Sequence, residues 1–171
     1  MHANKKELFK DYITNNLDKI YRLAFSFAKN QPDSEDIVHE SVKRALMYID
    51  SLKNDSYMGT WFYRIVVNTA NTYLKNKSKL VYLEDVSEES LATEDNYQDS
   101  DIYNQVMKLE AKYRIVIILK YFEDMTFEQI SEVLDENTNT VKTRVYTALD
   151  KLRIKICKEE GDNDGIHIQK S

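Results

Sequence analysis

The chain has 171 residues with 42% hydrophobic residues, three glycines, one proline, one cysteine and a net charge of −5 at pH 7. This size allows one ordinary domain or two small ones, and the scarcity of glycine and proline favours long helices over sheets. The single cysteine excludes an intramolecular disulfide and a cysteine zinc cluster, and no apolar run is long enough to span a membrane. The N-terminus lacks the apolar core of a signal peptide, so we expect a cytoplasmic protein.

Three amphipathic helices are predicted in a first module, residues 5–79. Apolar side chains recur at helical spacing over residues 5–29. A second helix begins near Pro32, which is tolerated in a first turn, and continues to about residue 49. A polar loop, residues 50–59, then leads into a third helix that starts near Trp61 and closes with cations before residue 80.

Charge is distributed unevenly along the chain. Residues 60–79 contain four cations and no acid, whereas residues 80–106 contain eight acids and no lysine or arginine. The acidic stretch has few aliphatic residues, so we expect a flexible linker at residues 80–101. Residues 138–158 again carry six cations against one acid. Two basic helical segments are therefore separated by an acidic strip.

The second module, residues 102–158, is predicted to end in a helix-turn-helix. Residues 102–122 form a strongly apolar segment whose length favours a helix. Thr126 and Gln129 have the spacing of a capping box, which predicts a short helix from residue 126 to residue 134. Asn137 is a good N-cap for a second helix. Residues 159–171 are expected to form a disordered tail.

The polar face of this last helix has the side chains needed to meet a DNA major groove. Its apolar stripe includes Val141, Val145 and Leu152, and the opposite side shows amides, hydroxyls and cations. The candidate residues there are Asn139, Lys142, Thr143, Arg144, Tyr146 and Thr147. An ordinary helical hairpin with a solvated basic face would show the same pattern.

The start of the third helix has residues suited to unpaired bases. Aromatic faces stack on bases, amides read base edges, and cations meet phosphates. The candidates are Tyr57, Trp61, Arg64, Asn68, Asn71 and Lys75. Trp61 is equally well explained as an anchor of the hydrophobic core, because it lies on the apolar stripe with Ile65 and Thr69.

At this point the chain resembles the extracytoplasmic-function class of bacterial sigma factors, which keep only regions 2 and 4. The resemblance rests on DSEDIVHESVKRAL and TWFYRIVVNTANTYL in the first module, and on KYRIVIILKYFEDMTFEQISEVL followed by NTVKTRVYTALDKLR in the second. It implies an all-α fold of two small helical domains, a region 2 bundle and a region 4 helix-turn-helix bundle, and initiation of transcription from a stress- or envelope-responsive regulon.

The resemblance also assigns roles to the candidate residues. The third-helix residues, with Asn68 in the pocket of a flipped base, would bind the minus-10 promoter element, and the last-helix residues would bind the minus-35 element. Contacts to core RNA polymerase, at the coiled coil of its largest catalytic subunit, are implied for Glu35, Asp36, His39, Glu40 and Lys43. Further implied partners are the polymerase flap and a membrane-linked anti-sigma factor.

The chain departs from the family pattern in the helix-turn-helix and within the apolar segment that precedes it. Asp135 and Glu136 stand in the turn where the family often has a glycine and an apolar residue, and Glu110-Ala111 stands where Leu-Pro-Glu is common. The alternatives are a helix-turn-helix regulator that acts without polymerase and a helical scaffold that binds only proteins. Scattered histidines and the lack of a glycine-rich phosphate loop give no support to an enzyme, a cofactor or a metal site.

Overall fold

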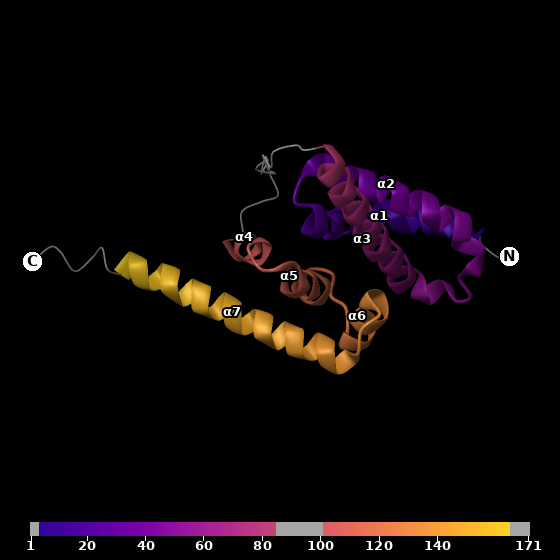
Figure 1. Ribbon diagram of the computed structural model, residues 1–171. Coiled ribbons are helices and arrows are strands. Elements are labelled where there is room, and N and C mark those ends of the chain that lie inside the picture. Colours follow the sequence, from indigo (N-terminus) through magenta and orange to yellow (C-terminus); the bar gives the residue numbers. More distant parts are fainter. Residues whose placement is uncertain (1–3, 85–100, 165–171) are drawn as a thin grey trace, which may run out of the picture.

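The computed structural model describes residues 4–84 and 101–164, and within these ranges all regular structure is helical. The helices are α1 (Lys5–Ala28), α2 (Gln31–Tyr48), α3 (Met58–Glu84), α4 (Asp101–Met107), α5 (Ala111–Ile117), α6 (Phe127–Leu134) and α7 (Thr138–Asp164). Short 3-10 turns lie at Ile49–Ser51 and Asp55–Tyr57, and the π-helical turn Ile118–Phe122 continues α5. Helices α1–α3 form a first domain and α4–α7 a second (Figure 1). The all-α expectation is confirmed.

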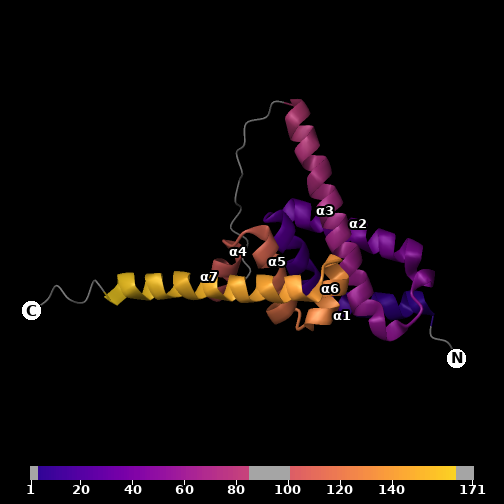
Figure 2. The same cartoon turned by 60° about the horizontal axis from the view of Figure 1, so that its bottom comes forward.

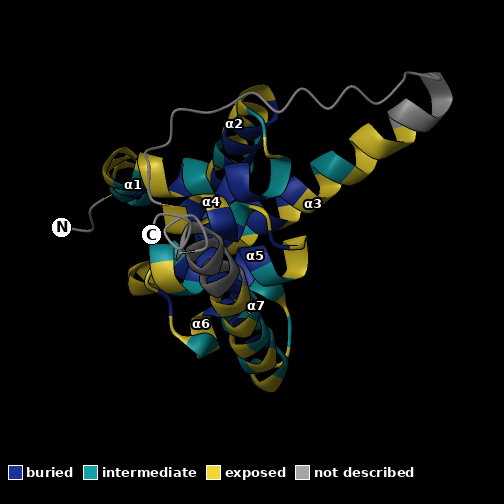
Figure 3. Cartoon of the chain, turned by 90° about the vertical axis from the view of Figure 1, so that its left-hand side faces the viewer, coloured by how far each residue is buried: buried dark blue, intermediate teal, exposed yellow. Residues whose placement is uncertain are grey.

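The first domain is a bundle in which α1, α2 and α3 pack against one another. Phe9, Ile20, Ile37 and Phe62 are among its fully buried side chains, and the buried residues gather where the helices face each other (Figure 3). The reversal between α1 and α2 is short because Lys29 takes a left-handed conformation (φ 59°) and ends α1. Two helices thereby reverse direction within a few residues.

Two helices extend farther than the sequence patterns indicated. Helix α3 continues to Glu84, although the acidic linker was expected from residue 80. The intervening residues Leu80–Leu83 contain no glycine or proline to stop the helix. Helix α7 continues to Asp164 through a single glycine, Gly161, although a disordered tail was expected from residue 159. The remainder of the expected linker and tail lies outside the described residues.

The helix expected over residues 102–122 is broken, and a buried arginine binds a carbonyl at the break. Helix α4 ends at Met107, and α5 begins at Ala111. Arg114 Nη1 donates to the carbonyl of Leu109 at 2.7 Å, so the carbonyl freed at the break has a charged partner. Leu109 itself is buried in the core. The break falls next to Glu110-Ala111, where Leu-Pro-Glu is common in the family.

The helix-turn-helix follows the predicted capping. The Thr126 hydroxyl accepts from Gln129 N at 3.2 Å, and Gln129 Oε1 accepts from Thr126 N at 2.9 Å, which completes the capping box. Asp135 ends α6 with φ 53°, a left-handed conformation that aspartate adopts more readily than most residues. Asn137 Oδ1 then accepts from Asn139 N at 2.8 Å and caps α7. The turn is regular despite Asp135.

The two domains lie against each other rather than apart. Helix α5 and the turn after it pack on α1, and α6 packs on α3 (Figures 1 and 2). Buried apolar residues of both domains form one continuous core. Helix α7 runs along the second domain and projects away from the first. The sequence patterns indicated two modules and gave no sign that they would pack together.

Candidate functional site

One face of α3 presents the polar residues expected to meet single-stranded DNA. Arg64, Asn68, Asn71 and Lys75 are all exposed. Their spacing of four, three and four residues places them on one side of a helix. On the opposite side, Phe62, Val66 and Ala70 are buried in the domain core. The core of the first domain therefore holds this polar row toward solvent.

A hollow lies at the N-terminal end of α3. It is lined by Ser51, Leu52, Lys53, Asn54, Tyr57, Thr60, Trp61, Arg64 and, from the second domain, Glu132. Tyr57 is 57% exposed, whereas Trp61 is half-buried and meets Phe9 edge-on with ring centroids 6.2 Å apart. Trp61 therefore packs against the core and also lines the hollow. Asn68 is not in the lining.

The candidate duplex-reading face lies at the start of α7. Asn139, Thr143 and Tyr146 are exposed, and Lys142 and Thr147 are half-buried. Val141, Val145 and Ala148 hold the other side of α7 in the core. Lys142 Nζ sits 5.6 Å from the ring centre of Phe127, a cation–π distance. The polar residues predicted on this helix are thus brought to one accessible surface.

Arg144 is already engaged within the second domain. Its Nη2 lies 3.0 Å from Glu136 Oε1, in the turn between α6 and α7. The Glu136 amide also donates to the carbonyl of Ser131 at 3.1 Å. Glu136 therefore has a partner on α7 and a backbone bond to α6, which explains how an acid replaces the apolar residue common at this position. Contact of Arg144 with DNA would compete with this ion pair.

The residues expected to meet polymerase lie along the outer face of α2. Glu35, Asp36, His39 and Lys43 are exposed, and Glu40 is half-buried. Glu40 accepts from Arg44 Nε at 3.0 Å and from Lys43 Nζ at 3.4 Å, and these hydrogen bonds lower its pKa. A groove between α2 and α3 continues this face; it is lined by Asp36, His39, Glu40, Lys43, Arg44, Thr69, Thr72, Tyr73 and Asn76. Thr69 Oγ1 is buried there without a hydrogen-bond partner among the described residues.

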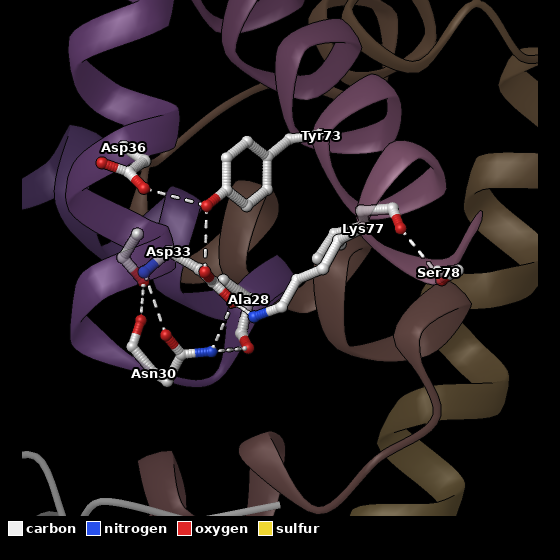
Figure 4. A network of polar contacts seen from close by, with 9 residues as sticks. Ala28, Asn30, Asp33, Asp36, Tyr73, Lys77 and Ser78 are labelled. Atoms are coloured by element: carbon white, nitrogen blue, oxygen red, sulfur yellow. Dashed lines mark hydrogen bonds and ion pairs between the residues drawn. The ribbon is translucent and has the colours of Figure 1, made fainter. Parts of the chain in front are cut away.

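A polar cluster that the sequence patterns did not reveal ties this face to α3. Tyr73 Oη lies 3.0 Å from Asp33 Oδ1 and 2.9 Å from Asp36 Oδ2 (Figure 4). Asp33 also accepts from the Asn30 amide at 2.9 Å and pairs with Lys77. Burial and these two carboxylates raise the pKa of Tyr73. The cluster fixes the start of α2 against the second half of α3.

The Asp33 carboxylate is held in its charged form. Burial would raise its pKa, but hydrogen bonds from Lys77, Asn30 and Tyr73 outweigh burial and lower the pKa below the ordinary value. Only 10% of the Asp33 side chain is exposed. Its partners Tyr73 and Lys77 lie 40 and 44 residues away in the sequence.

A second cluster joins the two domains. Glu123, with a side chain that is 0% exposed, accepts from Tyr63 Oη of α3 at 2.9 Å and pairs with Arg22 of α1 at 3.3 Å. Arg22 Nη1 also donates to the carbonyl of Phe122 at 3.3 Å. Burial raises the pKa of Glu123, while the contacts with Tyr63 and Arg22 oppose that rise. No sequence motif pointed to these three residues.

A buried arginine makes another contact between the domains. Arg114 Nε donates at 2.6 Å to the carbonyl of Ser26, in the last turn of α1, where carbonyls have no partner within the helix. The same guanidinium donates to the carbonyl of Leu109. Closer to solvent, Arg64 Nη2 lies 4.0 Å from Asp135 Oδ1. Polar contacts therefore link α5 to α1 and the turn after α6 to α3.

Residues 4–84 and 101–164 contain no group of three or more His, Cys, Asp or Glu side chains placed to hold a metal ion. Within the same ranges, none of the helices combines the length and the apolar character required to cross a bilayer.

Comparison with known proteins shows which family the chain resembles in both of its domains. Residues 12–80 match the model of Sigma-70 region 2, and residues 100–152 match that of Sigma-70 region 4. The chain is 43% identical over 157 residues to RNA polymerase sigma factor SigV of Bacillus subtilis (strain 168), covering 91% of this chain and 95% of the relative. It is 30% identical over 165 residues to ECF RNA polymerase sigma factor SigW of the same strain, covering 86% and 88%.

The chain therefore belongs to the extracytoplasmic-function (ECF) family of RNA polymerase sigma factors. Two solved structures share its fold. One is the sigma factor RpoE in complex with the anti-sigma factor NepR from Bartonella quintana, with a TM-score of 0.74 at 24% identity over 85% of this chain and 94% of that chain. The other is CnrH in complex with the cytosolic domain of CnrY, with a TM-score of 0.65 at 20% identity over 91% of each chain.

Proposed function

We propose that this ECF sigma factor binds core RNA polymerase, directs it to promoters with defined minus-10 and minus-35 elements, and starts transcription of a stress- or envelope-responsive regulon. In this proposal the protein recognises promoter DNA, catalyses no reaction itself and acts in the cytoplasm. The observation that carries the proposal is the pair of polar faces on α3 and α7, each held toward solvent by a buried apolar stripe. A chain with two such faces suits a two-part promoter.

Each face is assigned by the chemistry it offers. Arg64, Asn68 and Lys75 on α3, with the aromatic hollow beside them, suit the bases and phosphates of a melted strand. On α7, the exposed amide, hydroxyl and phenol groups and Lys142 suit base edges and phosphates in a major groove. The charged face of α2 binds the coiled coil of the largest polymerase subunit in this proposal. The second domain binds the polymerase flap.

An anti-sigma factor is proposed as a further partner. One solved structure of similar fold holds the sigma factor RpoE together with the anti-sigma factor NepR, and the other holds CnrH together with the cytosolic domain of CnrY. A membrane-linked anti-sigma factor would hold this chain inactive until a signal arrives. Co-purification of the tagged chain from cells, with and without envelope stress, tests whether a membrane protein is bound only before stress.

Run-off transcription with purified core polymerase on genomic fragments tests the central proposal. Mapped start sites should share sequence elements about 10 and 35 base pairs upstream, with the spacing fixed by the holoenzyme. A gel shift with and without core enzyme separates this function from a regulator that binds DNA alone. Absence of start sites above the level of core enzyme alone would refute the proposal.

A further inference from the structure

An exposed loop between α2 and α3 forms one wall of the hollow, and both of its ends are anchored in the core. Residues 53–57 are all exposed, whereas Leu52 before them is 4% exposed and Met58 after them is 5% exposed. Within the loop, Asn54 Oδ1 accepts from Ser56 N at 3.0 Å and from Ser56 Oγ at 2.8 Å. The loop is therefore short, fixed at both ends and closed by its own hydrogen bonds.

Lys5, the first residue of α1, reaches this loop from 47 positions away in the sequence. Its Nζ donates at 2.6 Å to the carbonyl of Leu52, which itself lines the hollow. Leu52 lies between the two 3-10 turns, so its carbonyl is not part of a helical ladder. A hydrogen bond from a charged donor is about twice as strong as one between neutral groups. Lys5 therefore fixes the backbone at the point where the loop leaves the core.

The place of Lys5 in the chain is not explained by the needs of α1 itself. The N-terminus of a helix carries partial positive charge and favours acids, yet α1 begins with Lys5 and Lys6 ahead of its acid, Glu7. Lys6 is exposed, whereas Lys5 is half-buried and has a defined acceptor. Lys5 also precedes the match to Sigma-70 region 2, which begins at residue 12. Its role follows from its contact and not from the family motif.

Two further residues of α1 support the hollow from the same side. Lys5, Phe9 and Tyr12 are spaced by four and three residues, so they share one face of the helix. Phe9 meets Trp61 edge-on, with ring centroids 6.2 Å apart. A Cβ at Gly59 would lie 3.2 Å from Tyr12 Oη, so glycine allows the first turn of α3 to approach α1 closely. The start of α1 and the loop lie at the same end of the first domain (Figure 1).

We infer that Lys5 is a positioning residue for promoter opening: through the Leu52 carbonyl it holds the loop, and with it Tyr57, in the conformation that receives an unpaired base. Lys5 touches no DNA itself. A loop that is ordered before DNA arrives loses little conformational freedom when the base binds. The inference rests on the proposed function, which identifies the hollow as part of the minus-10 site.

Replacing the donor tests the inference in the full chain with core polymerase. Lys5→Met keeps the apolar stem and removes the donor, so promoter opening should fall about ten-fold, as expected for one hydrogen bond from a charged group. Opening is measured by permanganate reactivity of melted thymines at a start site mapped by run-off transcription. Lys5→Arg should restore most of the opening, because a guanidinium also donates. Lys6→Met is the matched control, since it removes the same charge from the same turn at an exposed position.

A double variant separates positioning of the loop from a general loss of stability. If Lys5 acts through Tyr57, Lys5→Met should add little to the loss already seen in Tyr57→Ala, because the side chain that Lys5 positions is gone. Independent effects would multiply instead. Multiplied losses in the double variant, or equal opening in Lys5→Met and Lys6→Met, would overturn the inference.

The fluorescence of Trp61 reports on the hollow without DNA, because Trp61 is the only tryptophan of the chain and lines the hollow. Acrylamide should quench Trp61 more strongly in Lys5→Met than in the parent or in Lys6→Met, with parental helical circular dichroism in all three. Unchanged quenching in Lys5→Met would refute the hold on the loop. Absence of promoter-directed transcripts with the parent chain would refute the proposed function, and the quenching comparison alone would then decide whether Lys5 holds the loop.

Discussion

Tyr63 in α3 and Glu123 after α5 share a hydrogen bond that crosses between the two domains, with Tyr63 Oη 2.9 Å from Glu123 Oε2. The residues are 60 positions apart, and both are buried. Burial and the Glu123 charge raise the pKa of Tyr63, so its hydroxyl keeps its proton and remains a donor. The bond therefore has Tyr63 as its donor and Glu123 as its acceptor.

Tyr63→Phe should lower the free energy of unfolding by about 1–3 kcal/mol, because a buried acceptor loses its donor while the ring is kept. The melting temperature, measured by circular dichroism, should fall by roughly 2–4 °C per kcal/mol for a chain of this size. Tyr57→Phe is the control, since Tyr57 is exposed and no hydrogen bond of its hydroxyl is seen. Equal melting temperatures for the two variants would contradict the assignment.

Asp33→Asn should destabilise the protein at pH 7 by about 2 kcal/mol, because a charged acceptor with three donors is neutralised. The folded-state pKa of Asp33 is lowered, so its contribution is fully present above the unfolded-state pKa and disappears as pH falls through the folded value. Urea unfolding of parent and variant at pH 7 and in the acid range should therefore show a gap that closes below about pH 4.

The exposed acid Asp11 on α1 offers a comparison for Asp33. Asp11→Asn should change the free energy of unfolding by less than about 0.5 kcal/mol at either pH. A gap between parent and Asp33→Asn that stays constant with pH would show that the carboxylate charge is not what stabilises the start of α2.

Replacing Lys142 and Arg144 together by alanine should abolish promoter-directed transcription and leave binding to core polymerase intact. If both cations meet phosphates, the slope of log affinity against log salt should fall by about 2. Arg153→Ala, nine residues beyond Arg144 and exposed on the same helix, is the control. Unchanged minus-35 footprints in the double variant would contradict a role for this face.

Tyr57→Ala and Trp61→Ala should separate base stacking from core packing. Loss of one stacked base costs about 1–3 kcal/mol, a 5- to 150-fold loss in promoter opening measured by permanganate reactivity of melted thymines. Tyr57→Ala should show that loss with an unchanged melting temperature, because Tyr57 is exposed. Trp61→Ala should also lower the melting temperature, because it leaves a gap against Phe9. Full opening activity in Tyr57→Ala would exclude stacking at that residue.

Local patterns predicted the helices and the two polar faces because their causes lie within a few residues. The capping box of Thr126 and Gln129 and the cap at Asn137 need no information from elsewhere in the chain. The same holds for the exposed row from Arg64 to Lys75, which follows from helical spacing. Family resemblance supplied what spacing alone lacked, namely the association of these faces with a two-part promoter.

Long-range polar contacts account for what the sequence did not predict. Arg114 donates to the Leu109 carbonyl at the break in the expected helix and to the Ser26 carbonyl of α1, 88 residues away. Glu123 has a fully buried side chain that contacts α1 and α3. Both depend on which domain faces they meet, and helical periodicity carries no information about that pairing.

Asp135 takes part both in the turn of the helix-turn-helix and in the contact between the two domains. Its left-handed backbone costs aspartate less than most residues, and glycine would adopt it without a steric penalty. Glycine would also remove the carboxylate that faces Arg64, although an exposed pair of this kind contributes little binding on its own. A family member with glycine here gains a more stable turn and has no charge at this point. This chain keeps aspartate in the turn and, with it, a negative charge where α6 packs on α3.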